Sequence, residues 1–131
     1  MIRRTLRIGR WLVYFFFAPD GYDKETILSF LDTFGASDKV MARAGEIMED
    51  GYLNRGFTFS NADLRRALVV IGPTSSGAEF QDSFSHEVRH LANAIAESIG
   101  YELDAEEPSY LTGDTVRELA EVVCNLGCDR C

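Results

Sequence analysis

The residues best suited to chemistry lie in one short motif, His86-Glu87-Val88-Arg89-His90, which holds both histidines of the chain. Positions four apart share a face of an α-helix, so His86 and His90 can direct their imidazoles at a single ion. Neutral imidazole nitrogen is a favoured zinc ligand, at about 2.0–2.1 Å. Glu87 reaches the same side, where it can accept a proton from an activated water. The motif predicts a hydrolytic zinc site; the plainer interpretation is an exposed helix that happens to carry two histidines.

The motif needs a helix, and the sequence predicts one from Gly77 to about Ile99. Ser76 and Glu79 form a capping-box pattern at its start, and Gly100 suits its end. Apolar residues recur along it at helical spacing: Phe80, Phe84, Val88, Leu91, Ala92, Ile95 and Ile99. The two histidines and Glu87 flank this stripe, which is where residues that line a cleft are expected.

The third metal ligand must come from another segment. A catalytic zinc site usually has three protein ligands and one position open to water. With no third histidine, the ligand must be a carboxylate or a thiolate. The helix after Gly100 is expected to pack antiparallel on the motif helix, with Glu106 and Glu107 in its first turn. Glu107 fits the capping-box position of a helix capped by Asp104, so Glu106 is the preferred ligand and Glu107 the alternative.

Tyr110 lies four residues after Glu106 and shares its helix face. Its hydroxyl could hydrogen-bond the bound water or a developing oxyanion, although an ordinary core or surface role explains it equally well. Gly113 continues the same face without a side chain and would let the two helices approach closely.

The preceding chain predicts a sheet and two further helices. The apolar run Trp11–Ala18 reads as a buried strand that ends in a turn. Helices are expected over Asp23–Gly35, with Asp23 as cap, and from Ser37 to about Asp50. Gly56–Ser60 and Ala67–Gly72 are predicted to form an antiparallel pair of strands.

The composition of the chain limits which kinds of binding partner are expected. The 131 residues are 46% hydrophobic and 26% charged, typical of one globular domain spanning residues 1–131. The net charge of −8 disfavours nucleic acid or an anionic membrane as the main partner. Residues 1–18 have the shape of a signal peptide, but the apolar run is short and lacks a cleavage site. We expect a cytoplasmic protein; the oligomeric state is left open.

The motif resembles that of a known family. His86-Glu87-x-x-His90, a downstream Glu and Tyr110-Leu111-x-Gly113 are similar to small gluzincin-type zinc metallopeptidase-like proteins of bacteria, especially Bacteroidetes, and of their phages and mobile elements. The segments Leu53–Asn61 and Val69–Ser76 extend the resemblance, which covers about residues 50 to 115. It implies the α+β fold class, with a small zincin-like fold in which Zn²⁺ lies between two helices. It also implies an edge strand that binds extended peptide, for which Ala67–Gly72 is the matching segment.

Cys124, Cys128 and Cys131 lie at the extreme C-terminus. Three thiols are one short of a four-cysteine zinc site, and their odd number favours reduced cysteines. We interpret residues 124–131 as a tail with incidental or loosely metal-binding cysteines; a second metal site completed by a carboxylate or another subunit is the alternative.

Two functional hypotheses follow. In the first, the protein is a zinc metallopeptidase that acts on a peptide or protein substrate, with His86, His90 and Glu106 as ligands and Glu87 as general base. In the second, it is a non-catalytic, metal-bound interaction or regulatory domain of a phage or mobile element. The second requires no role for Glu87.

Overall fold

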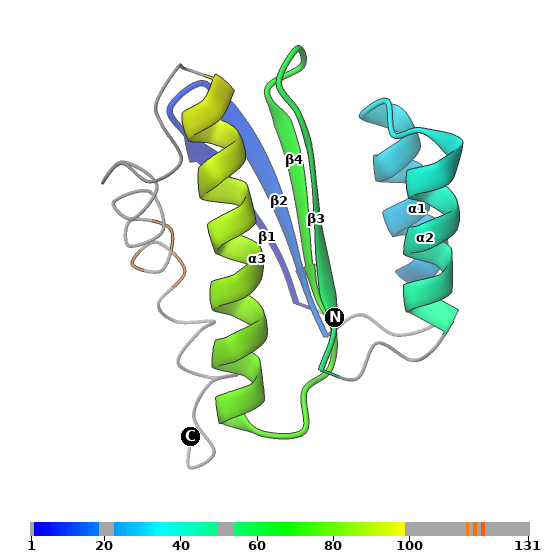
Figure 1. Cartoon of the computed structure of the whole chain (residues 1–131), viewed down its shortest axis with the longest axis vertical. Coiled ribbons are helices and arrows are strands. Elements are labelled where there is room, and N and C mark those ends of the chain that lie inside the picture. The colour runs from blue at the N-terminus through cyan, green and yellow to red at the C-terminus, as the bar shows by residue number, and fades with distance from the viewer. Residues whose placement is uncertain are drawn as a thin grey trace.

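The computed structural model describes residues 2–18, 23–49 and 54–98, together with Thr115, Arg117 and Leu119. It is a small α+β domain in which three helices pack against a four-stranded mixed sheet (Figure 1). In chain order the elements are β1 (Ile2–Ile8), β2 (Trp11–Phe17), α1 (Lys24–Thr33), α2 (Asp38–Glu49), β3 (Gly56–Asn61), β4 (Arg66–Ile71) and α3 (Gly77–Ser98).

The sheet has the strand order β1-β2-β4-β3. β1 and β2 form an antiparallel hairpin through the turn at Gly9, whose φ of 59° suits glycine. β2 pairs in parallel with β4, and β3 pairs antiparallel with β4. The predicted pairing of the two strands before α3 is therefore confirmed. β1 and β3 are the two edges of the sheet.

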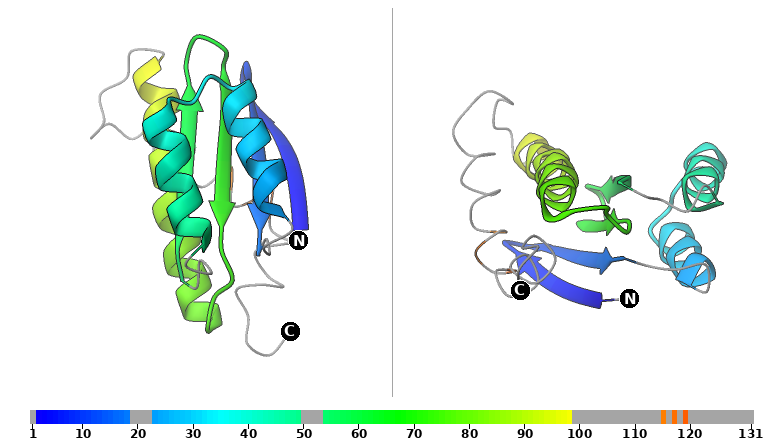
Figure 2. Two further views of the ribbon diagram at one scale, coloured as in Figure 1. Left: turned by 90° about the vertical axis from the view of Figure 1, so that its right-hand side faces the viewer. Right: turned by 90° about the horizontal axis from the view of Figure 1, so that it is seen from below.

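Helices cover both faces of the sheet (Figure 2). The side chains of β2 and β4 alternate between these faces, as the period of a strand requires. One face packs on α3 through Trp11, Val13, Phe15, Phe17, Ala67, Val69, Ile71, Phe80, Phe84, Val88, Leu91, Ile95 and Leu119. The other packs on α1 and α2 through Phe16, Ile27, Leu31, Ala44, Ile47, Met48, Leu68 and Val70. Because β2 and β4 are buried on both sides, they read as continuous apolar runs in the sequence.

Local signals set several helix ends. The Ser76 hydroxyl accepts a hydrogen bond from the Glu79 N–H at 3.1 Å, so Ser76 caps α3 as predicted. The Ser37 hydroxyl does the same for the Val40 N–H at 3.2 Å at the start of α2. Gly35, at φ 81°, ends the first helix region as expected. Asp23 occupies the N-cap position of α1, as predicted, but its side chain makes no capping hydrogen bond and its backbone is already helical.

Two strands differ from what the sequence predicted. The basic residues 2–8 were assigned no element from the sequence, and they form the edge strand β1. The segment Ala67–Gly72 was expected to be the peptide-binding edge strand, and this is wrong: β4 lies between β2 and β3, so both of its sides are already paired. Within the described ranges, no helix is long and apolar enough to cross a bilayer.

Candidate metal centre

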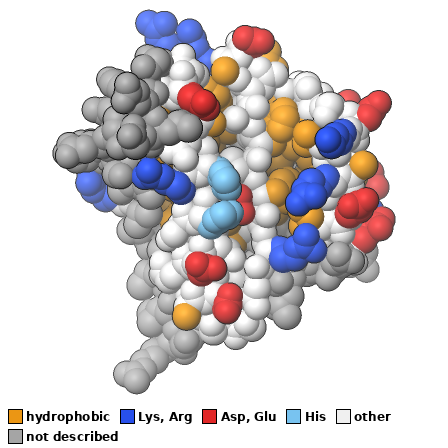
Figure 3. Space-filling view, in the orientation of Figure 1, with side chains coloured by type: hydrophobic (Ala, Val, Ile, Leu, Met, Phe, Trp, Pro, Cys, Tyr) orange, Lys and Arg blue, Asp and Glu red, His pale blue; other side chains and the backbone are white. Residues whose placement is uncertain are grey.

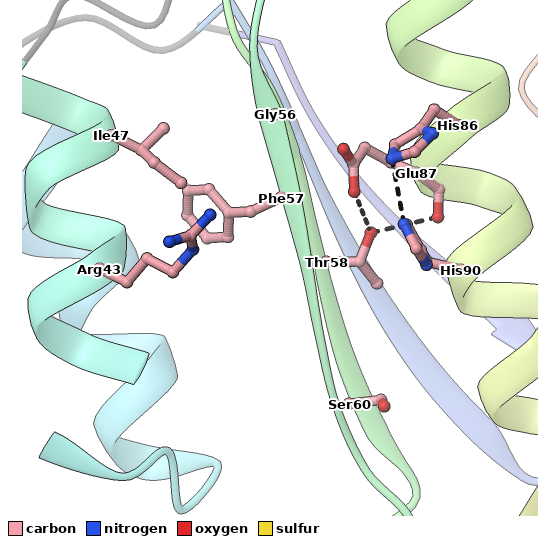
Figure 4. A pocket seen from close by; sticks show the side chains of 9 residues that line it. All are labelled: Arg43, Ile47, Gly56, Phe57, Thr58, Ser60, His86, Glu87 and His90. Atoms are coloured by element: carbon pink, nitrogen blue, oxygen red, sulfur yellow. Dashed lines mark hydrogen bonds between the residues drawn. The ribbon is translucent and has the colours of Figure 1, made fainter. Parts of the chain in front are cut away.

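The two histidines converge on α3. The Nε2 atoms of His86 and His90 lie 3.1 Å apart, and their rings meet nearly edge to face at 87° (Figure 4). Two nitrogen ligands about 2.0–2.1 Å from a tetrahedral ion would lie about 3.3–3.4 Å apart. The observed separation is close to that value, and both side chains are exposed to solvent. The pair therefore fits two positions in the coordination sphere of one zinc ion.

Glu87 lies beside this pair but is buried, with 6% of its surface exposed. Its carboxylate points toward β3, where the hydroxyl of Thr58 lies 3.0 Å from Oε1 and 3.1 Å from the Glu87 carbonyl oxygen. A hydroxyl has one proton to donate, so these two acceptors compete for it. The described contacts include no cation bound to Glu87, which leaves the carboxylate held by one neutral donor in a position bordering the histidines.

Gly56 allows this close approach of β3 to Glu87. A Cβ atom at position 56 would lie 2.5 Å from the Val70 carbonyl oxygen, 3.3 Å from Cγ of Glu87 and 3.6 Å from its Oε2. Side chains at alternate positions of a strand share a face, so Gly56, Thr58 and Ser60 all face α3 while Phe57 and Phe59 face α2. The small residues of β3 thus make room for the carboxylate, and Thr58 holds it.

The free edge of β3 presents main-chain groups to solvent. The Gly72 N–H bonds to the Arg55 carbonyl at 2.8 Å, which makes residues 55 and 72 a hydrogen-bonded pair. In an antiparallel ladder such pairs alternate with non-bonded ones, so the N–H and C=O groups of Gly56, Thr58 and Ser60 point away from β4. These same three residues line the pocket at the histidines.

A pocket of about 410 Å³ surrounds this edge and joins the two helix layers. Its lining comes from α2, β3 and α3: Arg43, Ile47, Gly56, Phe57, Thr58, Ser60, His86, Glu87 and His90. Figure 3 shows the histidines beside a hollow lined with hydrophobic side chains, with Lys and Arg side chains on the far rim. The geometry thus combines a pair of metal-binding nitrogens, a buried carboxylate and an unpaired strand edge in one groove.

Several predicted site residues cannot be placed. Glu106, Glu107, Tyr110 and the cysteines Cys124, Cys128 and Cys131 lie outside the described residues. Among the residues that are described, no group of three His, Cys, Asp or Glu side chains is arranged to hold a metal. The described part of the chain therefore supplies two candidate ligands, and the third, predicted at Glu106, stays a prediction.

Sequence reasoning missed the contribution of β3 and α2. The alternation Gly56-Phe57-Thr58-Phe59-Ser60 placed small and aromatic residues on opposite faces, and this pattern could have shown that one face lies against a close neighbour. Arg43 gave no such signal, because its place in the pocket depends on the strand order that brings α2 beside β3.

Comparison with known proteins identifies no relative. The chain matches no protein-family model, no curated protein and no solved structure.

Proposed function

We propose that this protein is a zinc-dependent peptidase of the gluzincin type with a zincin-like fold. The observation that carries the proposal is the convergence of the His86 and His90 Nε2 atoms, 3.1 Å apart, beside the buried carboxylate of Glu87. In the proposed site these histidines and Glu106 hold Zn²⁺, with Glu107 as the alternative third ligand. Zn²⁺, when bound, supplies the Lewis acidity that activates a water and polarises the carbonyl of the scissile bond.

The protein groups carry the proton. Glu87 accepts a proton from the attacking water and returns it to the amine that leaves when the peptide bond breaks. Thr58 fixes the carboxylate during this transfer, because its hydroxyl binds Oε1 at 3.0 Å. Burial of Glu87 between β3 and α3 keeps bulk water from competing for the same oxygen atoms. Tyr110 is the proposed donor to the developing oxyanion.

The proposed substrate is an extended peptide that adds to the edge of β3. The outward main-chain groups of Gly56, Thr58 and Ser60 support this mode, since strand addition uses unpaired N–H and C=O groups for affinity. They also line the pocket that contains the histidines, so a peptide on this edge would run past the proposed metal. This replaces the β4 segment as the binding strand.

Metal content and turnover together test the proposal. Elemental mass spectrometry should find about one zinc per chain in the wild type and a loss of zinc in His86→Ala. Glu106→Ala should lose zinc while Glu107→Ala keeps it, and the reverse would assign Glu107 as ligand. Glu87→Gln keeps an oxygen that can accept the Thr58 hydrogen bond, so it should retain zinc and lose peptide hydrolysis.

The same measurements distinguish the peptidase from the non-catalytic alternative. A metal-bound interaction domain would bind zinc and would show no hydrolysis in the wild type against a library of unstructured peptides. A wild type that takes up no zinc when zinc is supplied would reject both forms of the metal hypothesis.

A further inference from the structure

A second, smaller pocket lies on the α2 side of β3. It has a volume of about 200 Å³, below the usual range of about 300–1,000 Å³ for small-molecule sites. Its lining is mostly apolar and comes from α2 and β3: Val40, Arg43, Ala44, Ile47, Phe57, Thr58 and Phe59. This size and lining suit one large apolar side chain.

The small pocket continues the groove at the histidines. Arg43, Ile47, Phe57 and Thr58 line both cavities, so they form one surface that passes over the edge of β3. Figure 4 shows Arg43 and Ile47 on α2 on the opposite side of β3 from His86 and His90. A chain lying on this edge would therefore be flanked by α2 on one side and by α3 on the other.

Arg43 is available for a partner of opposite charge. Its side chain is exposed, and it makes no ion pair or hydrogen bond in the described part of the structure. It lines both pockets, on a chain whose net charge is −8. A basic group retained at a groove in an acidic protein favours a carboxylate in the occupant.

We infer that the α2 wall of the groove is a side-chain subsite that selects an extended peptide with one large apolar and one acidic residue two positions apart. Alternate side chains of a strand point the same way, so residues i and i+2 of a peptide on β3 both face α2. One fills the pocket beside Ala44 and Phe59, and the other meets the guanidinium of Arg43. This inference rests on the proposed peptide-binding function and names its substrate class.

The subsite is tested by measuring how tightly defined peptides bind to the Glu87→Gln variant. We expect this variant not to cleave peptides, so hydrolysis does not affect the measured affinity. The probes are fluorescein-labelled octapeptides of threonine that carry one leucine, with aspartate or lysine two residues away, in both orders. Fluorescence anisotropy is measured with and without added zinc. We expect the aspartate peptide of one order to bind about fivefold more tightly than its lysine counterpart. Replacement of its leucine by serine should weaken binding further.

Two charge reversals on α2 provide the matched comparison. Arg43→Glu should invert the preference between the aspartate and lysine peptides. Lys39→Glu makes the same charge change one turn earlier, at an exposed residue that lines neither pocket, and should leave the preference unchanged. Circular dichroism checks that both variants fold.

The outcomes distinguish this inference from the proposed function. Equal binding of the aspartate and lysine peptides, an unchanged ratio in Arg43→Glu, or no binding of any probe would overturn the subsite, whatever the zinc content. A preference that depends on Arg43 in a protein that neither binds zinc nor cleaves peptides would support the subsite and reject the peptidase.

Discussion

The two edges of the sheet are built differently. β1 carries Arg3, Arg4 and Arg7 within seven residues, and charged side chains of this kind prevent an edge from pairing with another strand. Arg3 also lies over the rings of Phe16 and Phe30, at 5.4 and 4.9 Å, so it covers apolar surface. β3 has no charged residue, and its edge opens into the pocket that contains both histidines. The comparison indicates that charged side chains protect the β1 edge against strand pairing, whereas the β3 edge lacks this protection.

We expect the largest effect on stability from a side chain added at Gly56, where β3 leaves space for Glu87. Gly56→Ala would place its Cβ 2.5 Å from the Val70 carbonyl oxygen, so the strand must shift. We expect a loss of about 1–3 kcal/mol in the free energy of unfolding, measured by urea denaturation. Gly45→Ala in α2 is the control, because its Cβ meets nothing within 4 Å and alanine should stabilise the helix. Equal stability of the two variants would contradict the close approach.

A threonine on each edge strand allows a direct comparison of function. Thr58→Val keeps the shape but removes the hydroxyl that binds Glu87, and we expect about a tenfold lower kcat with unchanged zinc content. Thr58→Ser should restore most of the rate. Thr5→Val on β1 changes an exposed residue and should have no effect on kcat. If Thr58→Val changed only KM, or if Thr58→Val and Thr5→Val changed kcat equally, Thr58 would not act by positioning the Glu87 carboxylate.

Adding charge to the open edge should make it behave like β1. Ser60→Lys introduces the kind of residue that protects β1, and we expect about threefold weaker binding of a leucine-containing threonine octapeptide by anisotropy. Thr5→Lys adds the same charge to the edge that is already basic and should leave binding unchanged. If both substitutions weaken binding equally, a general charge effect explains the result and β3 is not the binding edge.

The smallest effect concerns the ion pair that links α1 to α2, the helix that forms one wall of the groove. Lys24 Nζ lies 2.8 Å from Glu49 Oε1. The hydrogen bond from Lys24, together with the positive charge of its ammonium group, holds the pKa of Glu49 below its ordinary value of 4.5. The pair therefore stabilises the fold above pH 4.5, and this contribution is lost as the pH falls through the lowered pKa. Lys24→Met should lower Tm slightly at pH 7 and not at pH 2. A Tm difference that persists at pH 2 would exclude ionisation as its cause.

Helical spacing and buried apolar runs were enough to predict β2, α1, α2, β3, β4 and α3 to within a few residues. β1 was not predicted, because its three arginines gave the segment the composition of a basic N-terminal region and hid the pattern of an edge strand. The strand order could not be predicted, since the parallel pairing of Phe15 with Val69 joins segments separated by two helices and β3. His86, Glu87 and His90 could be predicted as a unit because they lie within one helix. The family resemblance placed peptide binding on Ala67–Gly72, and without the strand order nothing showed that this segment lies inside the sheet. The hydrogen bond from Thr58 depends on that order.

The position of β3 between two helix layers has a consequence for which proteins can reach it. A strand of a folded protein is held within a sheet, so its neighbouring strands would have to enter the groove bounded by α2 and α3 together with it. A single polypeptide released from its native contacts can enter. If this groove binds peptide, the rate at which it engages another protein should depend on how often a segment of that protein unfolds locally, and stable domains should escape even when they contain a suitable sequence.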